Sequence, residues 1–320
     1  MSVTGEAGAG RPLVKAAVAS APPVGPPPLR SPLLPAAGRT IRTPWRDAVR
    51  GFVGSRTAMA GLVVLAAFLL LAVLAPLVAP YGADQQSLTD RLKPPSPAHA
   101  FGTDDLGRDV LSRVLFGAQI SLRVGIFAVA IALIVGSSLG LVAGFSGGKL
   151  DALFMRGMDI VLAFPSTLLA IGIVAMRGPS LEMALVAIGI VNIPIYARLA
   201  RSMAIGLKER EYVMAARCLG AARGRIVGRH ILPNALSPLI IQATLGIATA
   251  IIEAAGLGFL GLGAQPPAPE WGLMLTNGRA FLINAPWAMI FPGLAIMLTT
   301  LAFNLVGDGV RDALDPNFRV

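Results

Sequence analysis

Long apolar stretches alternate with short polar segments along most of this 320-residue chain. About 20 apolar residues in an α-helix are enough to cross the ~30 Å hydrocarbon core of a bilayer. Six stretches reach or approach that length, at residues 58–79, 122–145, 153–176, 184–204, 239–264 and 287–306. The pattern therefore predicts an all-α integral membrane protein with six transmembrane helices.

The third of these stretches is the least regular. Arg156 and Asp159 lie near its first turn, three residues apart, so they share one helix face and can offset each other's charge. Pro165 lies near its middle and is expected to kink the helix, which neighbouring helices can accommodate.

The composition agrees with a membrane protein. Hydrophobic residues make up 55% of the chain and charged residues 14%, whereas a soluble domain carries about 25% charged residues. The net charge of +10 does not indicate nucleic-acid binding, because aromatic residues are not interleaved with the basic ones. Positive charge at membrane edges is the commoner cause. The single cysteine, Cys218, excludes a disulfide framework within the chain.

The apolar pattern divides the chain into four segments. Residues 1–44 are rich in Pro, Ala and Gly and cannot bury enough apolar surface to offset their ordering entropy, so we expect a disordered cytoplasmic tail. Residues 45–119 hold the first transmembrane helix and a long external loop. Residues 120–310 form a core of five transmembrane helices, and residues 311–320 form a cytoplasmic C-terminal tail.

The distribution of Lys and Arg predicts the orientation in the membrane. With the N-terminus in the cytoplasm, the inner segments carry 20 of these residues and the outer segments carry 6. Cytoplasmic loops are enriched in Lys and Arg. Both termini and the Arg-rich segment 211–238 are therefore expected to face the cytoplasm.

The outer loop, residues 81–119, contains the string GTDDLGRDVLSR. Its spacing of Asp, Leu and Arg suits a short amphipathic helix that the Thr103 hydroxyl caps, with aspartates near the positive end of the helix dipole. Such a helix either lies solvated on the membrane surface or contacts a partner subunit or an external receptor.

The inner segment 211–238 combines helix-forming residues with a band of arginines. We interpret it as a short docking helix for a soluble partner, in which Ala215, Ala216 and Gly220 permit close backbone approach. Pro233 is expected to end the helical run, and the arginines can pair with acidic residues of the partner. The alternative is a solvated basic loop that only fixes the topology.

This segment resembles the EAA loop of the membrane subunits of bacterial ABC importers. The consensus Glu-Ala-Ala, Gly, Leu-Pro is matched, with Met in place of Glu, at Met214, Ala215, Ala216, Gly220, Leu232 and Pro233. His230 stands where Ile is usual. Four further stretches are similar to the C-type permease subunit of the dipeptide, oligopeptide and nickel branch, at residues 102–113, 159–171, 258–275 and 292–316. The resemblance extends from about residue 45 to the end of the chain.

The resemblance implies a type I ABC importer permease fold with a cytoplasmic coupling helix, in the bacterial inner membrane. Members of the family pair with a homologous second permease subunit, two ATP-binding cassette ATPase subunits and an external substrate-binding protein. The implied cargo is a di- or oligopeptide, or nickel or a related small solute. The implied ATPase-coupling loop comprises Glu211, Tyr212, Ala215, Ala216, Arg217, Gly220, Arg225, His230, Leu232 and Pro233.

The chain contains no GxxxxGK[ST] phosphate-binding loop. We therefore expect that it binds no cofactor and is not an enzyme. ATP and Mg²⁺ are expected to be used by the partner ATPase subunits.

Ionisable residues inside apolar stretches are costly and commonly functional. Glu253 lies deepest, and it either lines a translocation path or pairs across a helix or subunit interface, with Arg123 and Arg198 as candidate partners. The competing function is a self-sufficient secondary transporter or channel, which is expected to show internal repeats with ionisable sites at the midplane.

Overall fold

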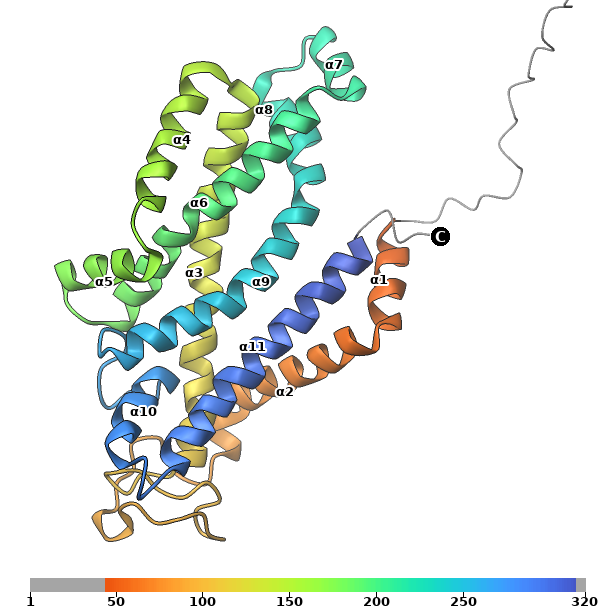
Figure 1. Cartoon of the computed structure of the whole chain (residues 1–320). Helices are drawn as coiled ribbons and strands as arrows, with labels where there is room; N and C mark the ends of the chain where they lie inside the picture. Colours follow the sequence, from red (N-terminus) through yellow and green to blue (C-terminus); the bar gives the residue numbers. More distant parts are fainter. Residues whose placement is uncertain (1–43, 315–320) are drawn as a thin grey trace, which may run out of the picture. The chain divides into compact units, whose positions relative to one another are not determined.

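The computed structural model describes residues 44–314, which form helices joined by loops (Figure 1). The outer loop between α2 and α3 lies at one end of this bundle, and α7 lies at the other. The α-helices are α1 (Pro44–Gly54), α2 (Arg56–Val78), α3 (Val110–Ser146), α4 (Gly148–Leu162), α5 (Ser166–Arg177), α6 (Leu181–Lys208), α7 (Glu211–Cys218), α8 (Arg223–Ile226), α9 (Leu232–Phe259), α10 (Trp271–Gly278) and α11 (Trp287–Leu314). A π-helical turn, Val227–Ile231, joins α8 to α9.

The six predicted membrane spans are confirmed. Five helical runs are long and apolar enough to cross a membrane: α2, α3, α6, α11 and the continuous run Arg223–Phe259. The sixth span consists of α4 and α5, if this bent pair is counted as one span.

The third span is broken rather than gently kinked. The axes of α4 and α5 differ by 89° at a break between Leu162 and Ser166. Pro165 has no N–H to continue the helical hydrogen bonding, and a residue before proline is displaced from the helical conformation. The expected single helix over residues 153–176 is therefore wrong, because the effect of Pro165 is larger than the predicted kink.

The start of the second span also differs from the prediction. α3 begins at Val110, twelve residues before the predicted start and inside the range assigned to the outer loop. Its N-cap is Asp109, whose carboxylate accepts hydrogen bonds from the backbone N–H and the hydroxyl of Ser112, at 2.8 and 2.7 Å. The separate amphipathic helix capped by Thr103 is not formed. The Thr103 hydroxyl instead accepts a hydrogen bond from the backbone N–H of Lys93, at 2.8 Å.

Among the described helices, α3 and α6 make the most extensive contact, and a row of glycines explains how near the two helices come. Gly136, Gly140 and Gly144 repeat every fourth residue along α3, so they share one face. A Cβ atom at Gly136 or Gly144 would lie 2.5 Å from a carbonyl oxygen of α6, and one at Gly140 would overlap the carbonyl oxygen of Ala197. Small residues in this spacing allow transmembrane helices to pack backbone to backbone.

The buried apolar side chains form two clusters that both include residues of α3 and α9. One joins the part of α3 from Val124 onward to α5, α6 and the α7 end of the bundle, and the other joins α2, the first part of α3, α10 and α11. Trp271 lies in the second cluster, fully buried, with its indole N–H donating to the carbonyl of Val114 at 3.0 Å. The outer end is thus tied together by both apolar packing and hydrogen bonds.

The two chain ends differ from the predicted segment bounds. The predicted disordered tail, residues 1–44, lies outside the described residues except for Pro44, which begins α1. That helix was not predicted; its Gly51 packs near Ala313. α11 runs on to Leu314, past the predicted boundary at residue 310, and residues 315–320 lie outside the described part of the chain.

Candidate functional site

The inner segment contains the predicted short helix, α7, which starts at Glu211. Val213 anchors it by full burial against the bundle. Gly220 ends it with a φ of 80°, in the left-handed region that glycine adopts without strain. The N–H of Ala221 donates to the carbonyl of Ala216 and that of Gly220 to Arg217, which is the paired pattern of a Schellman C-cap. Gly220 therefore provides the sharp turn predicted from the sequence.

α7 presents apolar side chains to its surroundings. Leu219 is 88% exposed, and Tyr212 and Met214 are close to half exposed. Ala215 is also exposed and Ala216 is half-buried. Large apolar side chains on a charged, solvent-facing segment are characteristic of a surface that a partner covers.

The basic residues of this segment do not all point outward. The guanidinium of Arg217 lies over the ring of Phe145 on α3, 5.7 Å from its centroid, which attaches α7 to the end of that helix. Beside it is a hollow of about 440 Å³ lined by Phe145, Ser146, Arg217, Arg223 and Ile226, among others. Arg225 is exposed. Arg217 thus stabilises the segment itself, which the sequence did not indicate.

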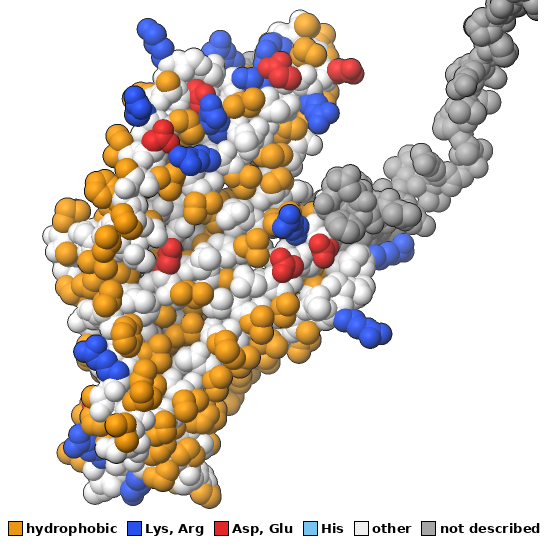
Figure 2. Space-filling view, viewed as in Figure 1, with side chains coloured by type: hydrophobic (Ala, Val, Ile, Leu, Met, Phe, Trp, Pro, Cys, Tyr) orange, Lys and Arg blue, Asp and Glu red, His pale blue; other side chains and the backbone are white. Residues whose placement is uncertain are grey.

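Charged side chains gather at this end of the molecule. Figure 2 shows Lys and Arg, with some Asp and Glu, over the end that carries α4, α6 and α7, whereas the middle of the same face is mostly apolar. Several Lys and Arg side chains also lie at the opposite end, and charge at the two ends of an apolar bundle is the distribution expected at membrane boundaries.

Pro233 does not end the helical run, contrary to the prediction. It lies in the first turn of α9, where a missing N–H is tolerated. The preceding turn widens to a π-helix, in which the N–H of Leu232 donates to the carbonyl of Val227. The side-chain amide of Asn234 reaches back to the carbonyl of His230, at 2.6 Å. The chain therefore stays helical from Arg223 to Phe259.

His230 lies on this widened turn, half-buried, with its ring 6.2 Å from that of Tyr212. The structure thus brings Tyr212 and His230 together across the loop, although they are 18 positions apart. The rest of the predicted coupling loop lies on α7 and at the start of α9, except for Gly220 in the turn after α7 and Arg225 in α8.

The charged residues within the spans are paired differently from the expectation. Glu253 on α9 accepts a hydrogen bond from the side chain of Asn192 on α6, at 2.9 Å. Arg198 pairs instead with Asp159, at 2.7 Å, and Arg123 is exposed. Within one copy of the chain, neither arginine is the partner of Glu253. The expected offset of Asp159 by Arg156 is likewise replaced by a pair between helices.

Asp159 belongs to α4 and Arg198 to α6, and a second ion pair joins the same two helices. The sequence did not indicate this second pair. Arg201 of α6 donates through Nε and a terminal nitrogen to both oxygens of Asp151 on α4, at 2.5 and 2.7 Å. Such two-point pairs fix orientation as well as distance. α4 has no buried residue of its own. The two ion pairs are therefore important in holding α4 against α6.

The outer end contains a buried polar cluster centred on Arg113, whose side chain is 1% exposed. Its guanidinium donates to the carbonyl of Ala83 at 2.8 Å and to those of Pro267 and Ala268 at 3.3 Å. Arg113 thereby joins three segments that are far apart in the sequence. Because GTDDLGRDVLSR contains so many charges, the sequence indicated a solvated helix and not a buried cluster.

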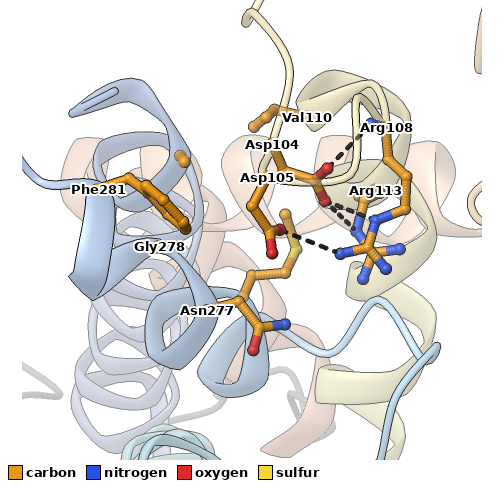
Figure 3. Close-up of a pocket in the computed structure, with 10 residues that line it drawn as sticks. Asp104, Asp105, Arg108, Val110, Arg113, Asn277, Gly278 and Phe281 are labelled. Carbon is orange, nitrogen blue, oxygen red and sulfur yellow. Dashed lines mark hydrogen bonds and ion pairs between the residues drawn. The ribbon is translucent and has the colours of Figure 1, made fainter. Parts of the chain in front are cut away.

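Aspartates complete this cluster. Asp104 accepts hydrogen bonds from the backbone N–H and the Nε of Arg108, at 2.9 and 2.6 Å, and lies 3.7 Å from Arg113. Figure 3 shows Asp104 and Asp105 facing these two arginines, with Asn277 of α10 beside them. The carboxylate of Asp109 accepts a hydrogen bond from Nδ1 of His99, at 3.0 Å. These pairs make the outer loop an ordered part of the bundle.

Together, these features define a class of protein. A bundle of membrane spans with a short helix that exposes apolar side chains at its charged end, and an ordered loop at the other end, fits a membrane-embedded permease subunit. The chain belongs to the family described as binding-protein-dependent transport system inner membrane component, whose profile matches residues 136–320. A second profile, the N-terminal TM domain of oligopeptide transport permease C, matches residues 43–95. The chain is therefore a multi-pass inner membrane protein of an ABC importer family.

Named relatives resemble almost the whole chain. The dipeptide transport system permease protein DppC of Alkalihalophilus pseudofirmus is 54% identical over 280 residues, 88% of this chain and 92% of the relative. A probable D,D-dipeptide transport system permease protein, DdpC of Escherichia coli, is 49% identical over 82% of this chain and 88% of its own length.

A solved structure confirms the type I importer permease fold. One chain of the inward-facing MetNI methionine ABC transporter superposes with a TM-score of 0.53 at 19% identity. The match covers 63% of this chain and 97% of the other. At this identity the likeness shows the fold alone.

Proposed function

We propose that this chain is the permease subunit of an ATP-driven importer of dipeptides or other short peptides. The cargo is inferred from the names of the relatives, which transport dipeptides and D,D-dipeptides and share about half of their residues with this chain. The membrane fold and the family supply the transport function. This chain provides the path through the bilayer and catalyses no reaction itself.

The single observation that carries the coupling part of the proposal is the surface of α7. Tyr212 and Met214 of α7, and Leu219 directly after it, are exposed apolar residues of a segment that Val213 and Arg217 attach to the bundle. Exposed apolar side chains on a short, firmly attached helix can enter a groove of a soluble partner and transmit force in both directions. We assign that partner as an ATPase subunit that binds ATP and Mg²⁺.

The complete transporter would contain this chain, a homologous second permease subunit, two ATPase subunits and an external substrate-binding protein. The inner end would be the α7 end, with both termini in the cytoplasm, because Lys and Arg are concentrated in the segments that would then face the cytoplasm. The outer loop ordered by Arg113 would then face the binding protein.

The experiment exchanges the exposed apolar residue directly after α7 for a charged one. Leu219→Asp should release the ATPase subunits, because it introduces a charge into the apolar contact while leaving every buried residue unchanged. The measurement is the amount of ATPase that copurifies with the chain from membranes in mild detergent. Ile283→Asp is the matched control, because Ile283 is equally apolar and 94% exposed but lies at the outer end.

Retention of the ATPase by Leu219→Asp would refute the assignment of α7 as the docking helix. Peptide uptake by the purified chain alone, in liposomes without ATP, would refute the importer itself and favour a self-sufficient transporter. The two results are independent, since the first tests the contact and the second tests the energy source.

A further inference from the structure

A hollow of about 250 Å³ opens between α5, α6 and α9. Its walls include the first turn of α5, with Ser166 and Thr167, and the α9 face that carries Glu253 and Gly256. The remaining lining is apolar, as with Val191 of α6. A small apolar cavity with a few convergent polar groups is the usual form of a small-molecule site.

Glu253 supplies the charge in this cavity. It lies six residues before Phe259, the last residue of α9, or about 9 Å from the helix end that faces the outer loop. Asn192 donates to one of its two carboxylate oxygens, Oε2, at 2.9 Å. This hydrogen bond fixes the orientation of the carboxylate and leaves the other oxygen available to accept a donor from the cavity.

Within the described residues, no Lys or Arg forms an ion pair with Glu253. Among the described residues that line the cavity, Glu253 is the one ionisable side chain. Arg198, the nearest candidate by sequence, is paired with Asp159. A carboxylate inside a membrane span is costly unless it faces a cation or water. A site with these properties selects a positively charged group.

We propose that Glu253 binds the ammonium group of the cargo as the cargo passes between α5 and α9. This inference rests on the proposed function and specifies which part of a peptide the permease recognises. A free α-amino group is common to dipeptides of either stereochemistry, which accommodates relatives named for dipeptides and for D,D-dipeptides alike. The cavity is smaller than the ~300 Å³ of a typical site for a whole ligand, so it suits the amino end of a peptide.

Glu253→Gln is the informative variant because it removes the charge and keeps the shape. The amide oxygen of glutamine can still accept the hydrogen bond from Asn192, so a purely structural role predicts no effect. The complete transporter, with its partner subunits, is reconstituted in proteoliposomes and supplied with binding protein and labelled dialanine. Maximal uptake should fall about tenfold in Glu253→Gln, the loss expected for one charge-assisted hydrogen bond.

Two comparisons make the test specific. Glu253→Asp, which keeps the charge, should retain more uptake than Glu253→Gln. Glu182→Gln, at an exposed position at the start of α6, should transport at the wild-type rate. ATP hydrolysis stimulated by the binding protein should stay near wild type in all three variants, because none alters α7.

A direct binding measurement bypasses the selectivity of the binding protein. In nanodiscs without that protein, saturation-transfer NMR should show contact of the wild-type transporter with dialanine and less contact with N-acetyl-dialanine. The difference should disappear in Glu253→Gln. Wild-type uptake by Glu253→Gln, or equal contact with the acetylated peptide, would overturn the amine site while leaving the importer intact. Failure of the wild-type transporter to take up dialanine with ATP would instead overturn the proposed function.

Discussion

Replacing Gly140 by alanine tests the close contact between α3 and α6. The change adds a single carbon atom, and the site is within the helix pair with the most extensive contact in the described chain. A Cβ at this position would overlap the carbonyl oxygen of Ala197 and lie 2.9 Å from the Cβ of Ala200. Real Cβ atoms essentially never approach another atom within 3.0 Å, so the helices must move apart.

The expected cost follows from two opposing effects. The obstructing atoms belong to the backbone and to a Cβ, which cannot rotate away, so overpacking costs about 2–3 kcal/mol. Alanine favours a helix over glycine by about 1 kcal/mol, which offsets part of that cost. The net destabilisation should therefore be about 1–2 kcal/mol. At about 2–4 °C per kcal/mol for a chain of this size, the midpoint of thermal unfolding should fall by about 5 °C.

The assay is the thermal loss of folded transporter in detergent, followed by fluorescence-detected gel filtration. Gly206→Ala on α6 is the matched control, because a Cβ there meets nothing within 4 Å. Its midpoint should stay level or rise, since only the helix propensity changes. A midpoint for Gly140→Ala at or above that of Gly206→Ala would refute the conclusion that the glycine row sets the distance between α3 and α6.

Two further predictions concern the outer end. Arg113→Lys should destabilise the protein by about 3 kcal/mol, because an ammonium cannot reach the carbonyls of Ala83 and Pro267 together, whereas the exposed Arg311→Lys should be neutral in the same unfolding assay. Burial raises the pKa of Glu270, although two backbone N–H groups oppose the shift. The stability that the buried, protonated carboxyl contributes is therefore fully present below the pKa of the unfolded state, and it is lost as pH rises through the pKa of the folded state. Glutamine resembles the neutral form, and the stability of the wild type relative to Glu270→Gln should therefore decline as pH rises above the ordinary pKa of a glutamate. A relative stability that does not change with pH would contradict this reasoning.

The sequence predicts the spans well because their signal is local. A run of about 20 apolar residues is sufficient to identify a membrane helix, whatever it packs against. The turn at Gly220 is equally local, since glycine after a helix-forming segment commonly adopts the left-handed conformation. The turn lies where the sequence places it, and the spans do so apart from the early start of α3 and the break at Pro165.

The failures share a different cause, which is pairing between distant residues. The sequence predicts that Arg113 is a surface charge, because only the fold brings Ala83 and Pro267 beside it. Similarly, Asp159 lies at helical spacing from Arg156, yet the break at Pro165 and the packing of α4 against α6 give it Arg198 instead. No local rule indicates these partners, because each depends on which helices become neighbours.

The continuous helical run from Arg223 to Phe259 gives the coupling segment and Glu253 a mechanical connection. The sequence indicated these two features separately, and an end to the helix at Pro233 would have disconnected them. With about 1.5 Å of rise per residue, the 37 residues extend for roughly 55 Å. Along this route, a displacement of α7 passes through the π-helical turn at Val227–Ile231 before it reaches the cavity. That turn and Pro238 inside α9 both interrupt the regular i→i−4 hydrogen bonding, so they are the two points at which the run can bend.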